Sequence, residues 1–476
     1  MVRFNSEGSY GMRALSESPR MWPGRPGLTP TPSSQRRMAE PHASAARRRV
    51  RYDPVAMEPA LLLLVPTRSY RTEDFVAAAG RLGVPVLLGS DLCHRVEETF
   101  GGVAGQVSLD YRRPERAAER IAEVARERVI GGVVPTDEGT ALIAALAAER
   151  LGLPHNPPEA TRRAGNKHLQ RVALAAAGLP VPPFSLHPLD EGPERAAVRV
   201  PYPCVLKPLA LSASRGVIRA DDPASFAVAW RRIEAILHGA RAERRPSDDG
   251  RPCLLVEGFV PGAEVALEGL LRGGRLEVLA LFDKPDPLDG PFFEETLYVT
   301  PSRHPVAAQE RVAELIAASA RALGLAEGPV HAELRLGPSG PVVLEVAARS
   351  IGGLCSRTLR FGAGVSLEEI VVAHAMGRPL APLARERRAA GVMMLPIPRG
   401  GILRGVGGLE AARAVPGVED VVITVPEGRE VRPLPEGDAY LGFAFARGER
   451  PEEVEAALRE AQRLLAIDIR PALPVA

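Results

Sequence analysis

Short apolar runs alternate with amphipathic segments over the first hundred residues after position 57. The apolar runs predict strands at residues 60–65, 84–88 and 130–134. The amphipathic segments predict helices at residues 72–82, 114–128 and 137–150, with Thr72 as a candidate N-cap of the first. Alternating strands and helices are typical of a parallel sheet that is covered by helices on both faces. We therefore expect an N-terminal α/β domain over residues 57–158.

The middle of the chain changes to short strands that are separated by turn residues. A linker at 153–160 (LPHNPPEA) precedes a helical pattern over 161–177, which carries Lys167. Further patterns predict a helix at 307–323, a hairpin at 329–347 and a helix at 366–376. These elements indicate a second domain over residues 159–385.

The two ends of the chain differ in character. Residues 386–476 contain strand patterns (GVMMLPI, EDVVITV, AYLGFAFA) and a final helix near 451–465, which predicts an α+β domain. Residues 1–56 are rich in Pro, Ser, Gly and Arg and have no periodicity, so they offer too little apolar surface to offset the cost of ordering. We interpret them as a disordered tail and expect the chain to fold without them.

Composition narrows the class of protein. Of the 476 residues, 45% are hydrophobic, and the longest apolar run of the body (ALLLLVP) is far below the roughly 20 residues that a membrane span needs. The net charge of +2 comes from the arginine-rich tail, so it does not indicate a nucleic-acid surface. Four cysteines without a CxxC motif predict neither a zinc site nor a disulfide framework. We expect a cytoplasmic protein without nucleic-acid or membrane partners.

Lysine is scarce, and this scarcity is informative. Of 60 basic residues only Lys167, Lys207 and Lys284 are lysine. A surface cation can be either residue type, so a lysine that persists in such a chain is a candidate for a site that needs a compact ammonium. Phosphate groups often provide such a site.

Two glutamates are expected to face each other across the predicted hairpin. The GPSG sequence favours a three-residue loop that pairs Gly337 with Pro341. This register places Glu333 directly opposite Glu345 on one face of the sheet. Like charges in this position are unfavourable unless a divalent cation lies between them, which predicts a magnesium or manganese site.

Two further segments suggest nucleotide binding. Lys207 ends an apolar strand and precedes a loop of small residues, an arrangement that is compatible with a phosphate lid. The segment CLLVEGFVPGAE (253–264) predicts a strand that enters a hinge, where backbone groups can pair with an adenine edge and Glu264 can accept from ribose hydroxyls.

Together these segments resemble the ATP-grasp superfamily over about residues 57–476. The resemblance lies in GNKHLQRVALAAAGLPVPPF, VLKPLALSASRGV, LVEGFVPGAEVALEG and HAELRL…VVLEVAARSIGGL. The segments FDKPDPLDGPFFEET and EVAARSIGGLCSRTLRFG are similar to those of carboxylate–amine ligases that join amino acids. The implied architecture is an ATP-grasp fold between a Rossmann-like pre-ATP-grasp domain and a C-terminal α+β domain. A homodimer is a further expectation from the resemblance.

The resemblance also implies roles for individual residues. The phosphates of ATP would contact Lys167 and Lys207, its adenine the hinge, and its ribose Glu264. The hinge residues are Glu257, Phe259 and Val260. The metal ligands would be Glu333 and Glu345, while Ala347 stands where many relatives have a third, asparagine ligand. The remaining assignments are catalytic roles for Arg349, Lys207 and Lys284, and substrate contacts for Glu295, Arg349, Gly352 and Gly353.

The implied reaction is attack of a substrate carboxylate on the γ-phosphate of ATP, followed by attack of an amine on the acyl phosphate. Such catalysis depends mainly on positioning and electrostatics. Three alternatives stay open: a biotin-carboxylase-like enzyme, a carbamoyl-phosphate-synthase-like enzyme, and a non-catalytic ATP-binding module. A carrier motif of the MKM type is absent from the chain, although carriers can be separate proteins.

Overall fold

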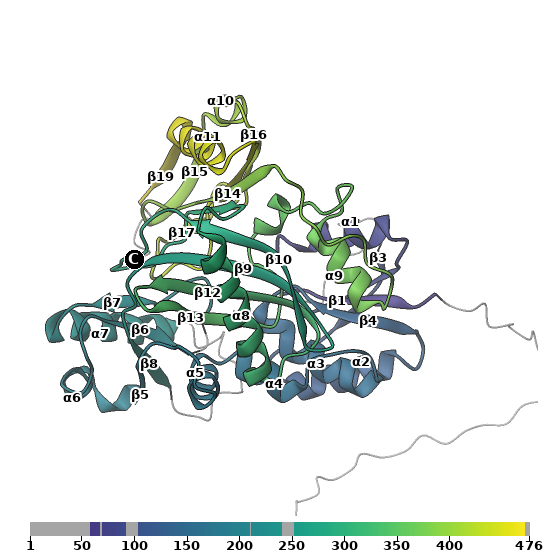
Figure 1. Cartoon of the computed structure of the whole chain (residues 1–476), viewed down its shortest axis with the longest axis horizontal. Coiled ribbons are helices and arrows are strands. Elements are labelled where there is room, and N and C mark those ends of the chain that lie inside the picture. Colours follow the sequence, from purple (N-terminus) through teal and green to yellow (C-terminus); the bar gives the residue numbers. More distant parts are fainter. Residues whose placement is uncertain (1–57, 67–68, 92–102, 210, 240–251, 472–476) are drawn as a thin grey trace, which may run out of the picture. The chain divides into compact units, whose positions relative to one another are not determined.

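A computed structural model describes residues 58–66, 69–91, 103–209, 211–239 and 252–471 (Figure 1). These residues belong to one unit, Ala56–Ala476. The predicted tail of residues 1–56 lies outside the described residues. No helix among the described residues is long and apolar enough to cross a membrane.

The N-terminal segment is a parallel sheet with helices, as the alternating pattern predicts. The sheet has the order β3-β2-β1-β4. Its strands are β1 (Ala60–Leu64), β2 (Val86–Ser90), β3 (Val103–Ser108) and β4 (Ile130–Pro135). The helices are α1 (Thr72–Arg81), α2 (Pro114–Val124) and α3 (Glu138–Leu151). The sequence pattern missed β3, because this edge strand alternates exposed and partly buried residues instead of forming an apolar run.

An eight-stranded antiparallel sheet dominates the rest of the chain (Figure 1). Its order is β13-β12-β9-β10-β11-β14-β18-β16. The first five in space are β13 (Gly340–Ala347), β12 (Gly328–Gly337), β9 (Ala263–Arg272), β10 (Arg275–Lys284) and β11 (Leu297–Thr300). The last three are β14 (Ala389–Leu395), β18 (Gly442–Gly448) and β16 (Val418–Ile423). This sheet therefore continues across position 385, where the sequence predicts a boundary between the second and third domains.

Two smaller sheets complete the architecture. One has the order β5-β8-β6-β7 and the other β17-β15-β19. Their strands are β5 (Phe184–Pro188), β6 (Cys204–Pro208), β7 (Ile218–Ala220), β8 (Cys253–Gly258), β15 (Gly401–Gly407), β17 (Glu430–Val431) and β19 (Ala466–Arg470). The other helices include α4 (Pro158–Ala164), α5 (Lys167–Ala176), α6 (Pro193–Ala197), α7 (Pro223–Gly239), α8 (Val306–Leu323), α9 (Leu367–Ala375), α10 (Leu409–Arg413) and α11 (Pro451–Leu464).

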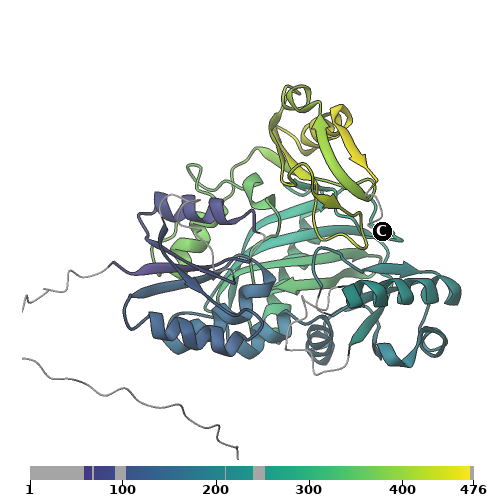
Figure 2. The ribbon, with the colours of Figure 1, turned by 180° about the vertical axis from the view of Figure 1, so that it is seen from behind.

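One hydrophobic core joins segments that are far apart in the sequence. It contains Leu61 of β1, Phe282 of β10, Phe443 of β18 and Phe361 from the chain before α9, all of which are fully buried. Figure 2 shows the N-terminal sheet beside the large sheet from behind. Burial of large side chains at about 25 cal/mol per Å² is the main force that holds these layers together.

The predicted helix over 161–177 is two helices in the structure. Helix α4 ends at Ala164, and Asn166 begins α5 by accepting hydrogen bonds from the backbone N–H groups of His168 (3.0 Å) and Leu169 (3.1 Å). An asparagine in this position is a strong N-cap, so the chain restarts there. The break places Lys167 in the first turn of α5. A second correction concerns α1, where Arg71 is the N-cap and Thr72 the first helical residue.

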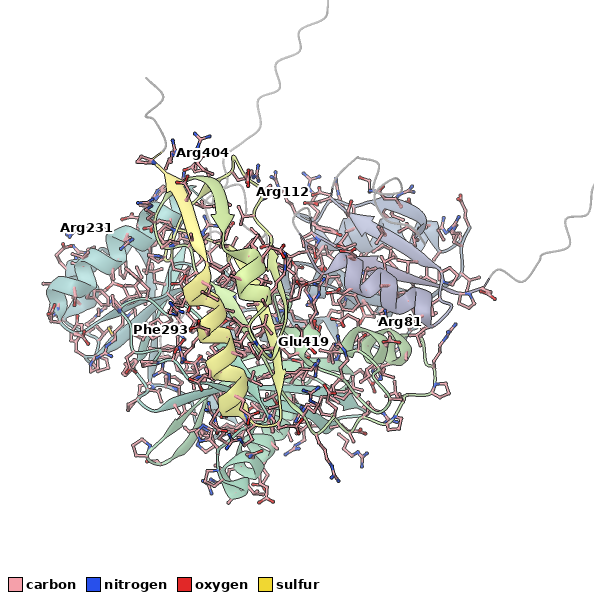
Figure 3. The ribbon with its side chains drawn as sticks, turned by 90° about the horizontal axis from the view of Figure 1, so that it is seen from above. Arg81, Arg112, Arg231, Phe293, Arg404 and Glu419 are labelled. Atoms are coloured by element: carbon pink, nitrogen blue, oxygen red, sulfur yellow. The ribbon has the colours of Figure 1, made fainter. Side chains whose placement is uncertain are left out.

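Arginine supplies the cations of the surface. Arg81, Arg231 and Arg404 are exposed and extend outward from three different parts of the fold (Figure 3). The three lysines, in contrast, are all partly or fully buried. The distribution agrees with the prediction that the lysines mark a site.

Candidate active site

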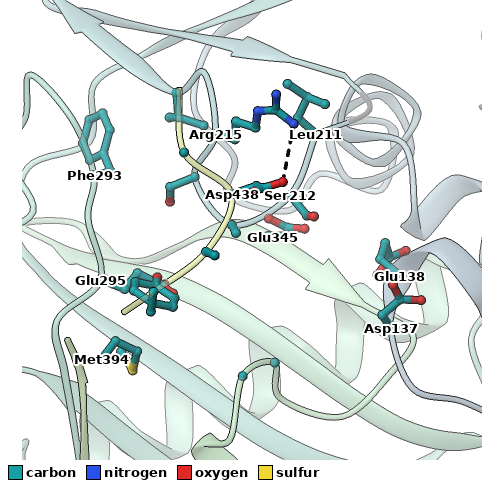
Figure 4. A pocket seen from close by; sticks show the side chains of 18 of the residues that line it. Asp137, Glu138, Leu211, Ser212, Arg215, Phe293, Glu295, Glu345, Met394 and Asp438 are labelled. Carbon is teal, nitrogen blue, oxygen red and sulfur yellow. Dashed lines mark ion pairs between the residues drawn. The ribbon is translucent and has the colours of Figure 1, made fainter. Parts of the chain in front are cut away.

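A cavity of about 1710 Å³ lies where the three predicted domains meet. Its lining includes Lys167, Lys207, Glu333, Glu345 and Arg349. The hinge residues Glu257, Phe259 and Val260 also line it, as do Glu264, Glu295, Gly352 and Gly353. Figure 4 shows side chains from distant segments around this hollow. The fold thus brings the residues predicted from sequence to one place, with Lys284 directly behind the wall.

The hairpin that carries two of these glutamates has a tighter turn than the sequence predicts. Strands β12 and β13 pair Gly337 with Gly340, which leaves a two-residue turn of Pro338 and Ser339. The predicted three-residue loop, with Gly337 opposite Pro341, is therefore wrong.

A β-bulge nevertheless restores the predicted opposition of the two glutamates. Leu334 pairs with Val343, and the register then shifts by one residue so that Glu333 faces Glu345. Leu344 is the extra residue of the bulge, which does what the longer loop was expected to do. The prediction that the two carboxylates share one face of the sheet is confirmed.

Cations surround Glu345. Burial raises the pKa of its carboxyl group, but the charges of Lys167, Arg349 and Lys207 outweigh this effect and lower the pKa. Glu345 therefore stays ionised, as a ligand of a hard divalent cation must be.

Lys207 belongs to a buried ion-pair chain. Its Nζ lies 2.7 Å from Glu257 Oε2, and Arg171 Nε lies 2.5 Å from Glu257 Oε1. Burial raises the pKa of Glu257, but these two cations lower it to about 2. The side chain of Glu257 thus orients Lys207, which leaves backbone groups of the hinge for adenine. Arg171 was not predicted from the sequence, although it follows Lys167 by four residues on the same helix face.

Lys167 contacts the loop that follows β6. Its Nζ donates to the carbonyl of Leu211 at 2.8 Å. In the same loop, Ala213 and Ser214 both have φ of +55°, a conformation that costs L-residues about 1–2 kcal/mol each. Strained backbone of this kind clusters at functional sites, which supports the prediction of a phosphate lid.

The C-terminal segment fastens this loop from the other side. The N–H of Gly216 donates to the carbonyl of Pro435 at 3.0 Å, and Arg215 forms an ion pair with Asp438 at 4.0 Å (Figure 4). Arg232 of α7 adds a two-pronged contact to Glu436 at 2.5 and 2.9 Å. The loop is therefore held between Lys167 and the C-terminal segment.

Lys284 lies at the centre of a carboxylate cluster. Its Nζ donates to Glu264 at 2.8 Å and to Glu295 at 2.5 Å, and it lies 3.5 Å from Glu333. The three carboxylates approach one another closely enough to hold a metal ion, but the ammonium already occupies the position between them. Burial lowers the pKa of Lys284, yet the three carboxylates raise it well above its usual value. This geometry favours a positioning role for Lys284 and leaves its predicted catalytic role a prediction.

The remaining hinge and ribose predictions fall on residues that already have partners. Glu264 also accepts from Arg335 Nε at 3.1 Å, and the guanidinium of Arg335 lies 5.1 Å from the centre of the Phe259 ring. Arg335 Nη1 donates to the carbonyl of Val260 at 3.2 Å. A carboxylate has about four acceptor positions, so Glu264 can still accept from a ribose hydroxyl. Arg335 was not predicted from the sequence, although it lies two residues after Glu333 in β12 and two such residues share a face of a strand.

The N-terminal domain contributes acidic groups that sequence reasoning did not find. Glu138 Oε2 lies 3.3 Å from Nε of Arg349, and Asp137 caps α3 beside it (Figure 4). Burial lowers the pKa of Arg349, but the neighbouring carboxylates, led by Glu138, raise it.

Position 353 requires glycine, because φ is +62° and a Cβ would lie 3.0 Å from the ring of Phe443.

A histidine connects the glutamate pair to the interior. His331 Nδ1 lies 3.1 Å from Oε2 of the fully buried Glu268, and its Nε2 lies 3.7 Å from Glu333. Glu268 also accepts from the N–H of Ile351 at 3.0 Å. Burial raises the pKa of Glu268. His331 therefore lies between the buried Glu268 and Glu333.

Comparison with known proteins agrees with this geometry. Residues 76–155 match the family described as the ATP-grasp N-terminal domain, and residues 200–358 match the ATP-grasp domain. The chain belongs to the ATP-grasp superfamily. Residues 393–470 match L-amino acid ligase C-terminal domain 2. Within the superfamily, this ATP-grasp protein is of the carboxylate–amine ligase type.

Individual relatives extend the comparison. The L-amino acid ligase from Bacillus licheniformis is 27% identical, with a TM-score of 0.75 over 87% of this chain and 99% of that one. Carnosine synthase 1 of Gallus gallus is 33% identical over 63% of this ATP-grasp chain and 33% of its own length, so the alignment spans only a third of that relative. An uncharacterized protein of Sinorhizobium fredii is 28% identical over 79% of this chain and 76% of its own. A biotin carboxylase domain from Hydrogenobacter thermophilus, 18% identical with a TM-score of 0.61, shares the fold.

Proposed function

We propose that the protein joins the carboxylate of one amino acid to the amine of another and converts ATP to ADP and phosphate. The juxtaposition of Lys167, Lys207, Glu333 and Glu345 in one cavity carries the proposal. Relatives named L-amino acid ligase and carnosine synthase support amino acids as the substrates. The cytoplasmic location and the homodimer expected from sequence stay predictions.

In the proposed reaction, a carboxylate oxygen attacks the γ-phosphorus of ATP, and the bond to the β-phosphate oxygen breaks to release ADP. The amine then attacks the acyl carbon, phosphate leaves, and the amine loses a proton. Lys207 and Arg349 would offset the negative charge that develops on the phosphoryl oxygens. Glu257 holds the ammonium of Lys207 in place.

Glu333 and Glu345 fit a divalent cation, because hard carboxylate oxygens face one another on the cavity wall. Magnesium or manganese bound there would neutralise charge on the nucleotide phosphates. A second group of carboxylates consists of Glu264, Glu295 and Glu333. The ammonium of Lys284 pairs with all three and neutralises part of their charge. One side-chain pair is therefore proposed for the cation, with no third side-chain ligand at Ala347.

Phosphate release from ATP, magnesium and pairs of amino acids tests the proposal. Stimulation by specific pairs, together with a new amide in mass spectrometry, is the expected result. Stimulation by bicarbonate and biotin would favour the biotin-carboxylase-like alternative, and stimulation by bicarbonate and ammonia the carbamoyl-phosphate-synthase-like one. Nucleotide binding without any phosphate release would support a non-catalytic module.

Lys207→Arg is expected to lower turnover about 100-fold. The planar guanidinium is larger than an ammonium and would share Glu257 with Arg171, so the phosphate contacts would be displaced. Steady-state phosphate release and the melting temperature measure the effect. Arg231→Lys exchanges the same two residue types on the surface and should change neither quantity. Near-normal turnover of Lys207→Arg would contradict the proposed need for a compact ammonium.

A further inference from the structure

Tyr440 brings the C-terminal segment to the cavity. It lies two residues before β18 and lines the cavity, as Met394 of β14 does. Its ring packs against Phe443 at 6.0 Å between ring centres. Tyr70, from the N-terminal domain, packs against the same Phe443 at 5.6 Å. The position of Tyr440 is thus set by an aromatic cluster that two domains share.

The hydroxyl group of Tyr440 is buried and has no hydrogen-bond partner among the described residues. Other tyrosines do have one: Tyr298 donates to Glu295 at 2.7 Å, and Tyr202 donates to the carbonyl of Ala197 at 2.9 Å. Buried polar groups are nearly always paired, so an unpaired hydroxyl in a side chain that lines a cavity needs an explanation. Burial raises the pKa of Tyr440 well above its usual value, so its hydroxyl stays protonated and can both donate and accept.

The titratable groups whose charges act on this hydroxyl are Glu295, Cys355, Lys284 and Tyr70. Cys355 Sγ lies 3.6 Å from Met394 Sδ, and both residues line the cavity. Gly353 leaves space beside Phe443 that a side chain would fill. The nearby charges of Lys284 and Glu295 are paired with each other at 2.5 Å. The surroundings therefore suit an uncharged group.

We propose that the hydroxyl of Tyr440 selects the side chain of one amino-acid substrate, favouring an uncharged side chain with a hydrogen-bonding oxygen or nitrogen. The inference rests on the proposed function and adds a class of side chain to it. A side chain of this class pairs the hydroxyl, whereas an apolar isostere leaves it buried and unpaired. A charged side chain would be desolvated beside charges that already neutralise each other.

Isosteric amino acids test the proposal, with the second amino acid held constant. The pairs are threonine and valine, tyrosine and phenylalanine, and asparagine and leucine. For the wild type we expect kcat/KM to favour the hydrogen-bonding member of at least one pair about tenfold, the value of one neutral hydrogen bond. Tyr440→Phe keeps the ring on Phe443 and should bring that ratio close to one, with the KM for ATP unchanged.

Binding provides a second measurement. The same preference should appear as a larger rise in melting temperature with the hydrogen-bonding member, in the presence of magnesium and a non-hydrolysable ATP analogue. Tyr202→Phe removes a hydroxyl outside the cavity and should keep the wild-type ratio. This control separates loss of selectivity from a general effect of losing a hydroxyl.

Two results would overturn the inference. An unchanged ratio in Tyr440→Phe would mean that the hydroxyl bonds to water. An equal rise in KM for both members of every pair would mean that it bonds to the α-carboxylate that all amino acids share. Absence of amino-acid-dependent phosphate release in the wild type would contradict the proposed function instead, while the melting-temperature shifts would still report selectivity.

Discussion

Glu345→Gln is expected to reduce magnesium-dependent turnover to background, a loss of more than about 1,000-fold. The amide keeps the size of the side chain but removes the charge that, with Glu333, is proposed to hold the cation. The melting temperature of the wild type should rise with ATP and magnesium, because a ligand that binds only the native state stabilises it. The variant should show little of this rise.

Glu345→Gln is also expected to change the stability of the metal-free protein, in the direction opposite to the one that the hairpin alone suggests. Two facing carboxylates repel, which suggests that Glu345→Gln is neutral or stabilising without metal. The structure adds Lys167, Lys207 and Arg349 around Glu345, and together they lower its pKa below the usual value. A lowered pKa means that the ionised carboxyl stabilises the folded state above the unfolded-state pKa, and that this is lost as pH falls.

Glu345→Gln should therefore lower the melting temperature of the metal-free protein at neutral pH, and the difference from wild type should shrink in acid. Glu277→Gln provides a matched control, because Glu277 lies in the same sheet, pairs with Arg272 and Arg275, and does not line the cavity. That control should retain turnover and the response to ATP and magnesium. Full activity in Glu345→Gln would contradict the metal site.

Lys284→Met is expected to destabilise the protein by about 3–5 kcal/mol, the usual cost of removing one partner from a buried ion pair. The ammonium is shielded from solvent and neutralises Glu264, Glu295 and Glu333. Because the carboxylates raise the pKa of Lys284, its stabilising charge is fully present at neutral pH. Thermal unfolding at pH 5 and pH 8 measures the loss, which should be smaller at the lower pH, where the freed glutamates can protonate.

Two further variants separate a positioning role from simple packing. The double variant Lys284→Met, Glu295→Gln has one unpaired carboxylate fewer than Lys284→Met. It should therefore recover part of the stability that the single variant loses. Calcium or manganese should stabilise Lys284→Met more than wild type, because the three carboxylates then offer an empty cation position. A variant with wild-type stability and no response to these cations would refute the proposed role of Lys284 as the cluster's counter-ion.

Local patterns were sufficient for the fold class, and they supplied the candidate site residues. The alternation of strands and helices predicted the N-terminal sheet, and the residues named from the family motifs, apart from Lys284, line one cavity. The scarcity of lysine pointed to Lys167, Lys207 and Lys284 because arginine replaces lysine elsewhere on the surface. These signals are readable because periodicity, turn chemistry and residue type act within a short stretch of chain.

Contacts between distant segments decided the rest. The facing of Glu333 and Glu345 depends on a bulge at Leu344, which neither strand's pattern reveals. The pairing of Lys284 with three glutamates brings together β9, β10 and β12 and the chain after β10. Burial, charge pairing and pKa are properties of such three-dimensional neighbours, and each depends on distances that sequence separation does not determine. The sequence therefore identified the chemical groups, and the tertiary structure decided which of them neutralise one another and which, like the hydroxyl of Tyr440, remain unpaired.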